Sequence, residues 1–95
     1  MSGADPAPAG GAPELPAPTL VLHVFSLAAQ VGVALGETEN PLTHQRETDL
    51  RAARFLIDTL AMLEQKTRGN RTPEEDEYLA GVLANLRMAC VRRSA

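Results

Sequence analysis

Tryptophan is absent from this sequence, and aromatic residues of all kinds make up only 3% of its 95 residues. The hydrophobic fraction is nevertheless 44%, so the core must be built from aliphatic side chains. This composition favours helices, in which Leu, Ala and Met are well accommodated. A chain of this length forms one domain at most. Its stability margin is narrow, because a small domain buries a modest share of its surface.

Cysteine occurs only once, as Cys90, so no internal disulfide is possible and nothing requires an oxidising compartment. The N-terminus has no basic start followed by an apolar run, which argues against a secretory signal. The formal net charge is −3 at pH 7. An acidic balance argues against duplex nucleic acid as the main partner, because phosphate binding relies on Lys and Arg. We therefore expect a soluble, cytoplasmic protein.

The longest apolar stretch covers residues 20–35. It is shorter than the ~20 residues that a spanning helix needs, and His23 and Gln30 interrupt it, which argues against a membrane role. The polar positions within the stretch fall at helical spacing. They predict a helix with a narrow polar stripe and an otherwise apolar surface. Thr19 is the expected N-cap of this helix, and Gly36 is its expected stop.

Residues 1–18 consist mainly of Ala, Pro and Gly. Their repeated prolines exclude a helix and favour an extended, solvated chain. We expect this tail to be disordered and residues 19–95 to form the helical domain. Within the tail, Pro13-Glu14-Leu15-Pro16 matches a P-x-x-P docking pattern. Because that pattern is short and common, a plain disordered leader is the simpler interpretation.

A second helix is expected to begin near Thr48, its candidate N-cap, with Asp49 favourably placed at the positive end of the helix dipole. Its apolar positions recur at spacings of three and four residues, which predicts one buried stripe. These positions are Leu50, Ala53, Leu56, Ile57, Leu60 and Leu63. Phe55 and Met62 lie off this stripe. Cations in the last turn, followed by Gly69, predict where the helix ends.

A third helix opens with a capping box, in which Thr72 is the N-cap, Pro73 takes the first helical position and Glu75 completes the box. Its apolar face consists of Leu79, Val82, Leu83, Leu86 and Ala89. Only a few residues separate the second and third helices, so they should pack as a long antiparallel hairpin. The sequence therefore predicts an all-α fold of three helices, the hairpin plus an apolar N-terminal helix.

Two short elements fall in the connections between these helices: Asn40-Pro41-Leu42-Thr43 in the first, and Lys66-Thr67 with Gly69-Asn70 in the second. Together with the apolar positions of the helices, they make residues 25–91 similar to a bacterial family known as domain of unknown function 1844. One departure is Arg71, where the family more often has an apolar residue. The resemblance implies a common fold unit and a bacterial origin, and it transfers no catalytic residues because the family has no known activity.

Residues with the chemistry for catalysis or metal binding are few and scattered. Lys66-Thr67 ends a helix, whereas a phosphate-binding loop needs glycines before Lys-Thr and a helix that begins there. His23, His44 and Cys90 are the soft metal ligands, and they lie on three separate elements with no paired spacing. His23 and Ser26 are one helical turn apart but have no third group or oxyanion hole. We expect no catalytic, cofactor-binding or metal-binding site, and no enzymatic activity.

Asp58 lies near the apolar stripe of the second helix, with Arg54 one turn earlier and Arg87 on the partner helix. A structural ion pair that fixes the register of the hairpin is favoured over a binding role for this carboxylate. Gly69 and Thr72 are expected to be structural as well, because they mark the end of one helix and the start of the next.

Three short helices cannot cover all the apolar surface that this sequence provides. Soluble proteins usually bury such surface in an interface, most often that of a twofold dimer. The expected contact stripe is Val21, Phe25, Ala28 and Gly32 of the first helix, where small residues permit close approach. The leading hypothesis is a non-enzymatic, homo-oligomeric adaptor, with an unidentified protein partner also open. The alternative is a nucleic-acid-associated accessory protein that uses its Arg clusters.

Overall fold

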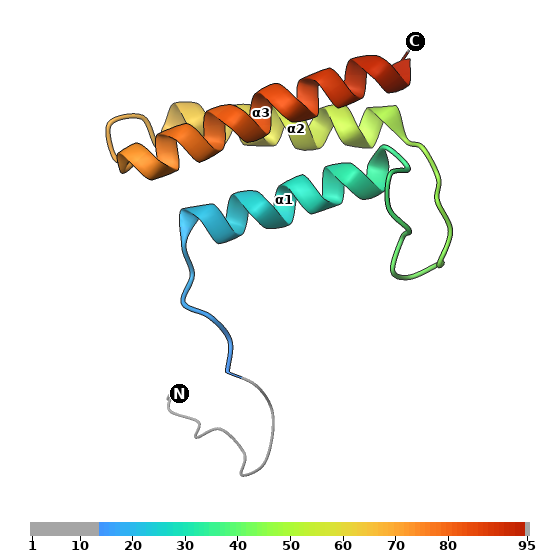
Figure 1. The fold of residues 1–95 in the computed structure, drawn as a ribbon, viewed down its shortest axis with the longest axis horizontal. Helices are drawn as coiled ribbons and strands as arrows, with labels where there is room; N and C mark the ends of the chain where they lie inside the picture. The colour runs from blue at the N-terminus through green and yellow to red at the C-terminus, as the bar shows by residue number, and fades with distance from the viewer. Residues whose placement is uncertain (1–13, 95) are drawn as a thin grey trace.

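The computed structural model describes residues 14–94, and within that range the chain forms three α-helices and no strand. They are α1 (Leu20–Ala34), α2 (Leu50–Lys66) and α3 (Pro73–Ser94). Figure 1 shows α2 and α3 side by side as an antiparallel hairpin, with α1 running along both of them. The all-helical prediction is confirmed. Most of the tail for which disorder was predicted, residues 1–13, lies outside the described residues.

Both ends of α1 follow the sequence signals. The Thr19 hydroxyl accepts a hydrogen bond from the Leu22 amide at 3.0 Å, which is the geometry of an N-cap. After the helix, Gly36 adopts a φ of 76°, in the left-handed region that glycine enters without steric penalty. A methyl group at Gly36 would lie 2.8 Å from Oγ1 of Thr48. This position therefore needs glycine for its backbone conformation and also for space.

The N-cap of α2 is Asp49, one residue later than the predicted cap at Thr48. The Asp49 carboxylate accepts from the Ala52 amide at 3.1 Å, while the Thr48 hydroxyl donates to the Leu35 carbonyl at 3.4 Å. The prediction was wrong because Thr48 is used in a contact between the two ends of the connection. The Asp49 amide also donates to the Ala34 carbonyl at 2.7 Å, so the end of α1 is fixed beside the start of α2.

The turn between α2 and α3 has the predicted geometry. Gly69 has a φ of 86°. Thr72 and Glu75 form the capping box, because the Glu75 amide donates to the Thr72 hydroxyl at 3.1 Å and the Thr72 amide donates to the Glu75 carboxylate at 2.8 Å. At the far end of the hairpin, Arg54 donates to the Ser94 hydroxyl at 3.1 Å, which holds the last turn of α3 beside the first turns of α2.

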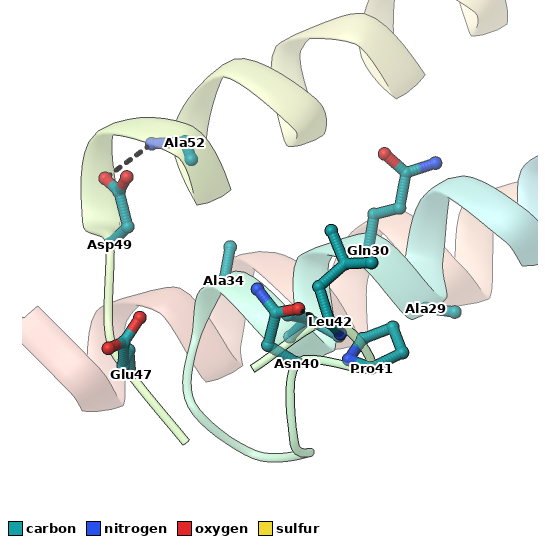
Figure 2. Close-up of a pocket in the computed structure, with 10 residues that line it drawn as sticks. Ala29, Gln30, Ala34, Asn40, Pro41, Leu42, Glu47, Asp49 and Ala52 are labelled. Atoms are coloured by element: carbon teal, nitrogen blue, oxygen red, sulfur yellow. Dashed lines mark hydrogen bonds between the residues drawn. The ribbon is translucent and has the colours of Figure 1, made fainter. Parts of the chain in front are cut away.

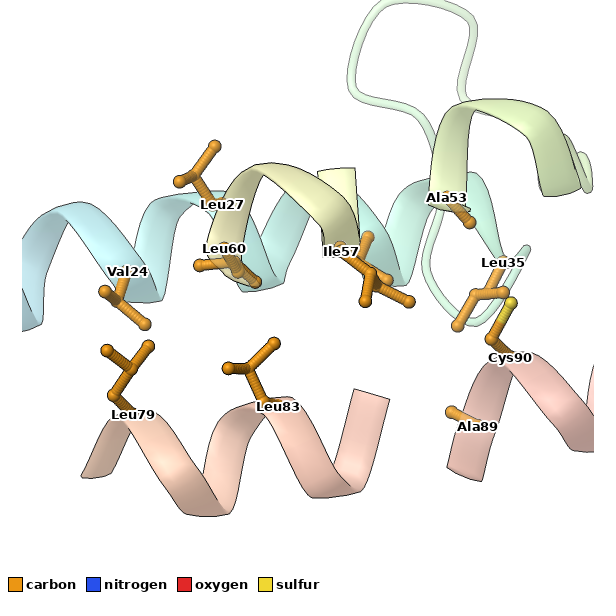
Figure 3. Close-up of a cluster of buried hydrophobic side chains, with 11 residues drawn as sticks. Val24, Leu27, Leu35, Ala53, Ile57, Leu60, Leu79, Leu83, Ala89 and Cys90 are labelled. Carbon is orange, nitrogen blue, oxygen red and sulfur yellow. The ribbon is translucent and has the colours of Figure 1, made fainter. Parts of the chain in front are cut away.

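The core is aliphatic, as the composition predicts. Figure 3 shows side chains from all three helices meeting in it, with Val24 of α1 facing Leu79 of α3 and Leu35 beside Cys90. The buried residues are Val24, Leu27, Val31, Leu35, Ala53, Ile57, Leu60, Leu79, Leu83, Ala89 and Cys90. The predicted stripes of α2 and α3 supply most of this set. The polar stripe of α1 is exposed, as expected for its solvent edge.

Candidate interaction surface

The stripe predicted as an interface on α1 is only partly available to a partner. Val21 and Phe25 are exposed, and Phe25 keeps 60% of its surface. Ala28 and Gly32 are half-buried. A methyl group at Gly32 would lie 3.7 Å from Oγ1 of Thr38, so the connection after α1 lies against this part of the helix. The open part of the stripe is therefore its N-terminal half.

Both phenylalanines of the chain lie on the surface. Phe55 on α2 is 71% exposed, and Met62, two turns further along the same helix, is exposed as well. Their position off the buried stripe of α2 was visible in the sequence. Large exposed apolar side chains are informative because a soluble domain normally buries such residues first.

An open groove of about 600 Å³ lies where the end of α1, the α1–α2 connection and the start of α2 meet. Figure 2 shows Leu42 and Pro41 of the connection beside Ala29 and Gln30 of α1, with Asp49 and Ala52 of α2 across from them. Its lining residues are Ala29, Gln30, Val33, Ala34, Asn40, Pro41, Leu42, Glu47, Asp49 and Ala52. This lining is mostly apolar with a few polar groups, which is typical of a recognition site.

The wall that carries Leu42 is a compact, hydrogen-bonded turn. The side-chain oxygen of Asn40 accepts from the Leu42 amide at 2.8 Å, and the Asn40 carbonyl accepts from the His44 amide at 2.8 Å. The Asn40 amide donates to the Gln45 carbonyl at 2.9 Å and closes the turn. Leu42 remains 88% exposed. The local hydrogen bonds therefore hold a large apolar side chain in contact with water.

Two acidic side chains line the groove on its α2 side, and a cation follows in the first turn of α2. Glu47 and Asp49 line it, and one carboxylate oxygen of Asp49 is engaged by the Ala52 amide. Glu47 is exposed, and so is Arg51 in the first turn of α2. Within the described residues, the salt bridge of the structure joins Arg71 to Asp76, so neither Glu47 nor Arg51 is engaged in an intramolecular ion pair there.

Residues 17–92 match the family described as Domain of unknown function (DUF1844). The chain belongs to this family. No curated protein and no solved structure matches it. Of the two elements that carry the resemblance in the sequence, Asn40-Pro41-Leu42-Thr43 forms the exposed turn at the groove, and Lys66-Thr67 with Gly69-Asn70 forms the tip of the hairpin.

Arg71, where the resemblance led us to expect an apolar residue in the family, has a mostly buried side chain. Its side chain is only 10% exposed, and its Nε lies 3.0 Å from Oδ1 of Asp76. That nitrogen has no hydrogen-bond partner because the N–H does not point at the oxygen, so the contact is an ion pair without a hydrogen bond. This nitrogen belongs to the charged guanidinium and is itself buried, so the nearby carboxylate of Asp76 offsets part of the cost of burying the charge. Because it is mostly buried and paired with Asp76, Arg71 does not add to the exposed positive charge at the hairpin tip.

The ion pair predicted at Asp58 is not found in this DUF1844 member. Asp58 is exposed, and it shares a surface hollow of about 400 Å³ with Arg54, Arg87 and Ser94. Arg54 uses its guanidinium to reach Ser94 instead. Exposed side chains gain little from pairing, because solvent screens the attraction and ordering two long chains opposes it. The register of the hairpin is therefore set by its apolar stripes and its turn.

The soft metal ligands stay apart in the described part of the chain. Cys90 is buried in the core, whereas His23 and His44 are exposed on α1 and on the connection. Residues 14–94 contain no group of three or more His, Cys, Asp or Glu side chains placed to hold a metal ion. In the same range, no helix combines the length and the apolar character needed to span a membrane.

Proposed function

We propose that this chain is a non-enzymatic interaction module of the bacterial cytoplasm whose first partner is a second copy of itself. The observation that carries the proposal is the exposure of both phenylalanines, Phe25 at 60% and Phe55 at 71%, on a domain whose fully buried core contains no aromatic side chain within the described residues. Aromatic side chains are enriched where proteins meet one another. A chain that exposes two of its three aromatic side chains is suited to association.

Self-association is the form of association that this surface favours. Large apolar patches on soluble proteins are usually covered in an interface, and twofold dimers are the commonest closed assemblies. On α1 the proposed contact consists of Val21 and Phe25, with the half-buried Ala28 and Gly32 at its margin. The contact is therefore centred on the N-terminal half of α1, because the α1–α2 connection lies against Gly32.

The test is the oligomeric state of the full chain, measured by light scattering and by sedimentation velocity between micromolar and hundred-micromolar concentration. We expect a dimer or a larger assembly that dissociates on dilution. Phe25→Glu should shift the equilibrium toward monomer if α1 forms the contact. Circular dichroism of the same samples reports whether the variant is folded, and Phe25→Ser provides a milder change at the same position. A folded monomer at every concentration, with no binding of a hydrophobic dye, would contradict the proposal.

Salt dependence separates this proposal from a nucleic-acid-associated role. Phosphate contacts weaken steeply as salt is added, whereas apolar interfaces do not. The exposed cations Lys66 and Arg68 lie at the hairpin tip, and Arg92 and Arg93 lie in the last turn of α3. Assembly that is unchanged between low and high salt supports the apolar contact. Binding to a mixed-sequence RNA or DNA oligonucleotide that disappears with salt would favour the alternative.

A further inference from the structure

The groove and an exposed aromatic ring lie next to each other on one surface of the molecule. Ala52 lines the groove, and Phe55 follows it by three residues on α2, so the two are neighbours on the helix surface. The groove is open and apolar, and the ring beside it is 71% exposed. When a cavity and a projecting side chain lie side by side, a second copy related by a 180° rotation can place its side chain in this cavity. The same rotation places the first copy's side chain in the cavity of the second.

The charges at this surface are also self-complementary. Two exposed acids, Glu47 and Asp49, line the groove, whereas the exposed Arg51 lies four residues before Phe55 on the same face of α2. An isologous contact uses the same patch twice, so the cation beside each projecting ring meets the acids of the other copy's groove. Pairs of this kind fix orientation and partner choice more than they add raw affinity.

The groove wall is already ordered before any partner arrives. Three hydrogen bonds made by Asn40 hold the turn that presents Leu42. Binding to a preformed surface avoids much of the entropy that is lost when a flexible loop is ordered. The exposure of Leu42 is therefore built into the connection, and a second copy that covers it removes apolar surface from water.

From these observations we infer that the groove is one half of a twofold contact between two copies of this chain. Phe55 of each copy enters the groove of the other beside Leu42, and Glu47 pairs with Arg51 of the other copy. The inference rests on the proposed self-association. It adds which surface of the molecule forms the contact and which side chains pair across it. It differs from the α1 stripe, where Phe25 lies on another helix and does not line this groove.

The first experiment measures the dissociation constant of full-length variants by sedimentation velocity. Leu42→Ser and Phe55→Ser should each raise it by about tenfold or more, because both remove an anchor side chain. Met88→Ser is the matched control, since Met88 is a similarly exposed apolar residue on α3 away from the groove. It should leave the constant unchanged. Circular dichroism verifies that each variant keeps the helical content of the parent.

The second experiment uses charge reversal and mixing, which does not depend on the apolar variants. Glu47→Arg and Arg51→Glu should each weaken self-association, because each places like charges opposite one another. Mixing the two single variants should give a heterodimer tighter than either homodimer, since both pairs then join opposite charges. The double variant should recover self-association in the same way.

The possible outcomes separate this inference from the proposed function. If the parent self-associates, but Leu42→Ser and Phe55→Ser behave like Met88→Ser and the mixed variants do not pair, the twofold groove contact is wrong while self-association stands. If Phe25→Glu alone yields folded monomers, the interface is on α1. If the parent is a folded monomer at every concentration, both the contact and the proposed function fail.

Discussion

The two connections between the helices are built for different purposes. In the α2–α3 turn, the hydrogen bonds act on helix ends: Thr72 and Glu75 cap α3, and the Thr67 hydroxyl donates to the Leu63 carbonyl at the end of α2. In the α1–α2 connection, Asn40 and its neighbours bond mainly to one another. The two ends of the long connection also join α1 to α2, so it contributes to stability at its ends and presents apolar surface in its middle.

The sharpest comparison of the two connections uses their left-handed glycines. Gly36→Ala should lower the free energy of unfolding by about 3 kcal/mol, since it combines left-handed strain with overlap against the connection. The added methyl group would lie 2.8 Å from Oγ1 of Thr48 and 3.3 Å from the Glu47 carbonyl oxygen. At Gly69 nothing lies within 4 Å, so Gly69→Ala should cost only the strain, about 1 kcal/mol.

Urea denaturation at a fixed protein concentration measures both glycine variants, and the parent at the same concentration is the reference. Equal losses for Gly36→Ala and Gly69→Ala would mean that the contact between Gly36 and Thr48 relaxes freely. The two ends of the α1–α2 connection would then not be held together as tightly as the short distances indicate.

At the short turn, Thr72→Ala should lower the free energy of unfolding by about 1 kcal/mol through loss of the cap. Thr72→Ser is the control, because serine keeps the hydroxyl that accepts from the Glu75 amide. Thermal unfolding followed by circular dichroism compares the three proteins. If Thr72→Ala melts with the parent, the capping box does not limit the stability of the hairpin.

In the long connection, Asn40→Ala should change the free energy of unfolding by no more than about 0.5 kcal/mol, as exposed loop substitutions usually do. It removes the bond from the Leu42 amide to the Asn40 side chain, so the turn should loosen and self-association should weaken. Asn40→Asp preserves the acceptor oxygen and serves as the control. A large loss of stability without any change in association would reverse the roles assigned to the two connections.

The smallest effect is expected at Asp58, between the two connections. Asp58→Ala should leave the free energy of unfolding within about 0.5 kcal/mol of the parent, because Asp58 is exposed and forms no salt bridge with Arg54 or Arg87. Chemical denaturation of Asp58→Ala and of Asp58→Arg measures this. Strong destabilisation of Asp58→Arg, with partial rescue by Arg87→Glu, would show that the pair forms in solution after all.

Features set by local spacing were predictable from the sequence. The apolar repeats of α2 and α3 gave the hairpin and its core, and the Thr72–Glu75 spacing gave the capping box. The position of Phe55 outside the repeat already marked it as exposed. In each case the relevant neighbours are three or four residues away, so helical geometry alone decides the contact.

Features set by distant contacts were not predictable in the same way. Thr48 and Asp49 are both good caps, and the contact of Thr48 with the Leu35 carbonyl decides between them. The groove forms because Ala29, Leu42 and Ala52 come together from three segments. No pattern of neighbouring residues in the sequence predicts such a contact. The salt bridge expected at Asp58 is absent from the described residues for another reason: a pair between exposed side chains gains little free energy, because solvent screens the attraction.

The hydrogen bond from the Asp49 amide to the Ala34 carbonyl has a consequence for how this domain can be altered. It joins the two ends of the α1–α2 connection, so the residues between them form a loop whose ends are already held together by the three-helix domain. Lengthening such a loop adds little to the entropic cost of closing it, because that cost grows only with the logarithm of the loop length. The entropic cost of a longer segment within residues 39–46 is therefore small, and this part of the loop is where an inserted segment should disturb the three helices least.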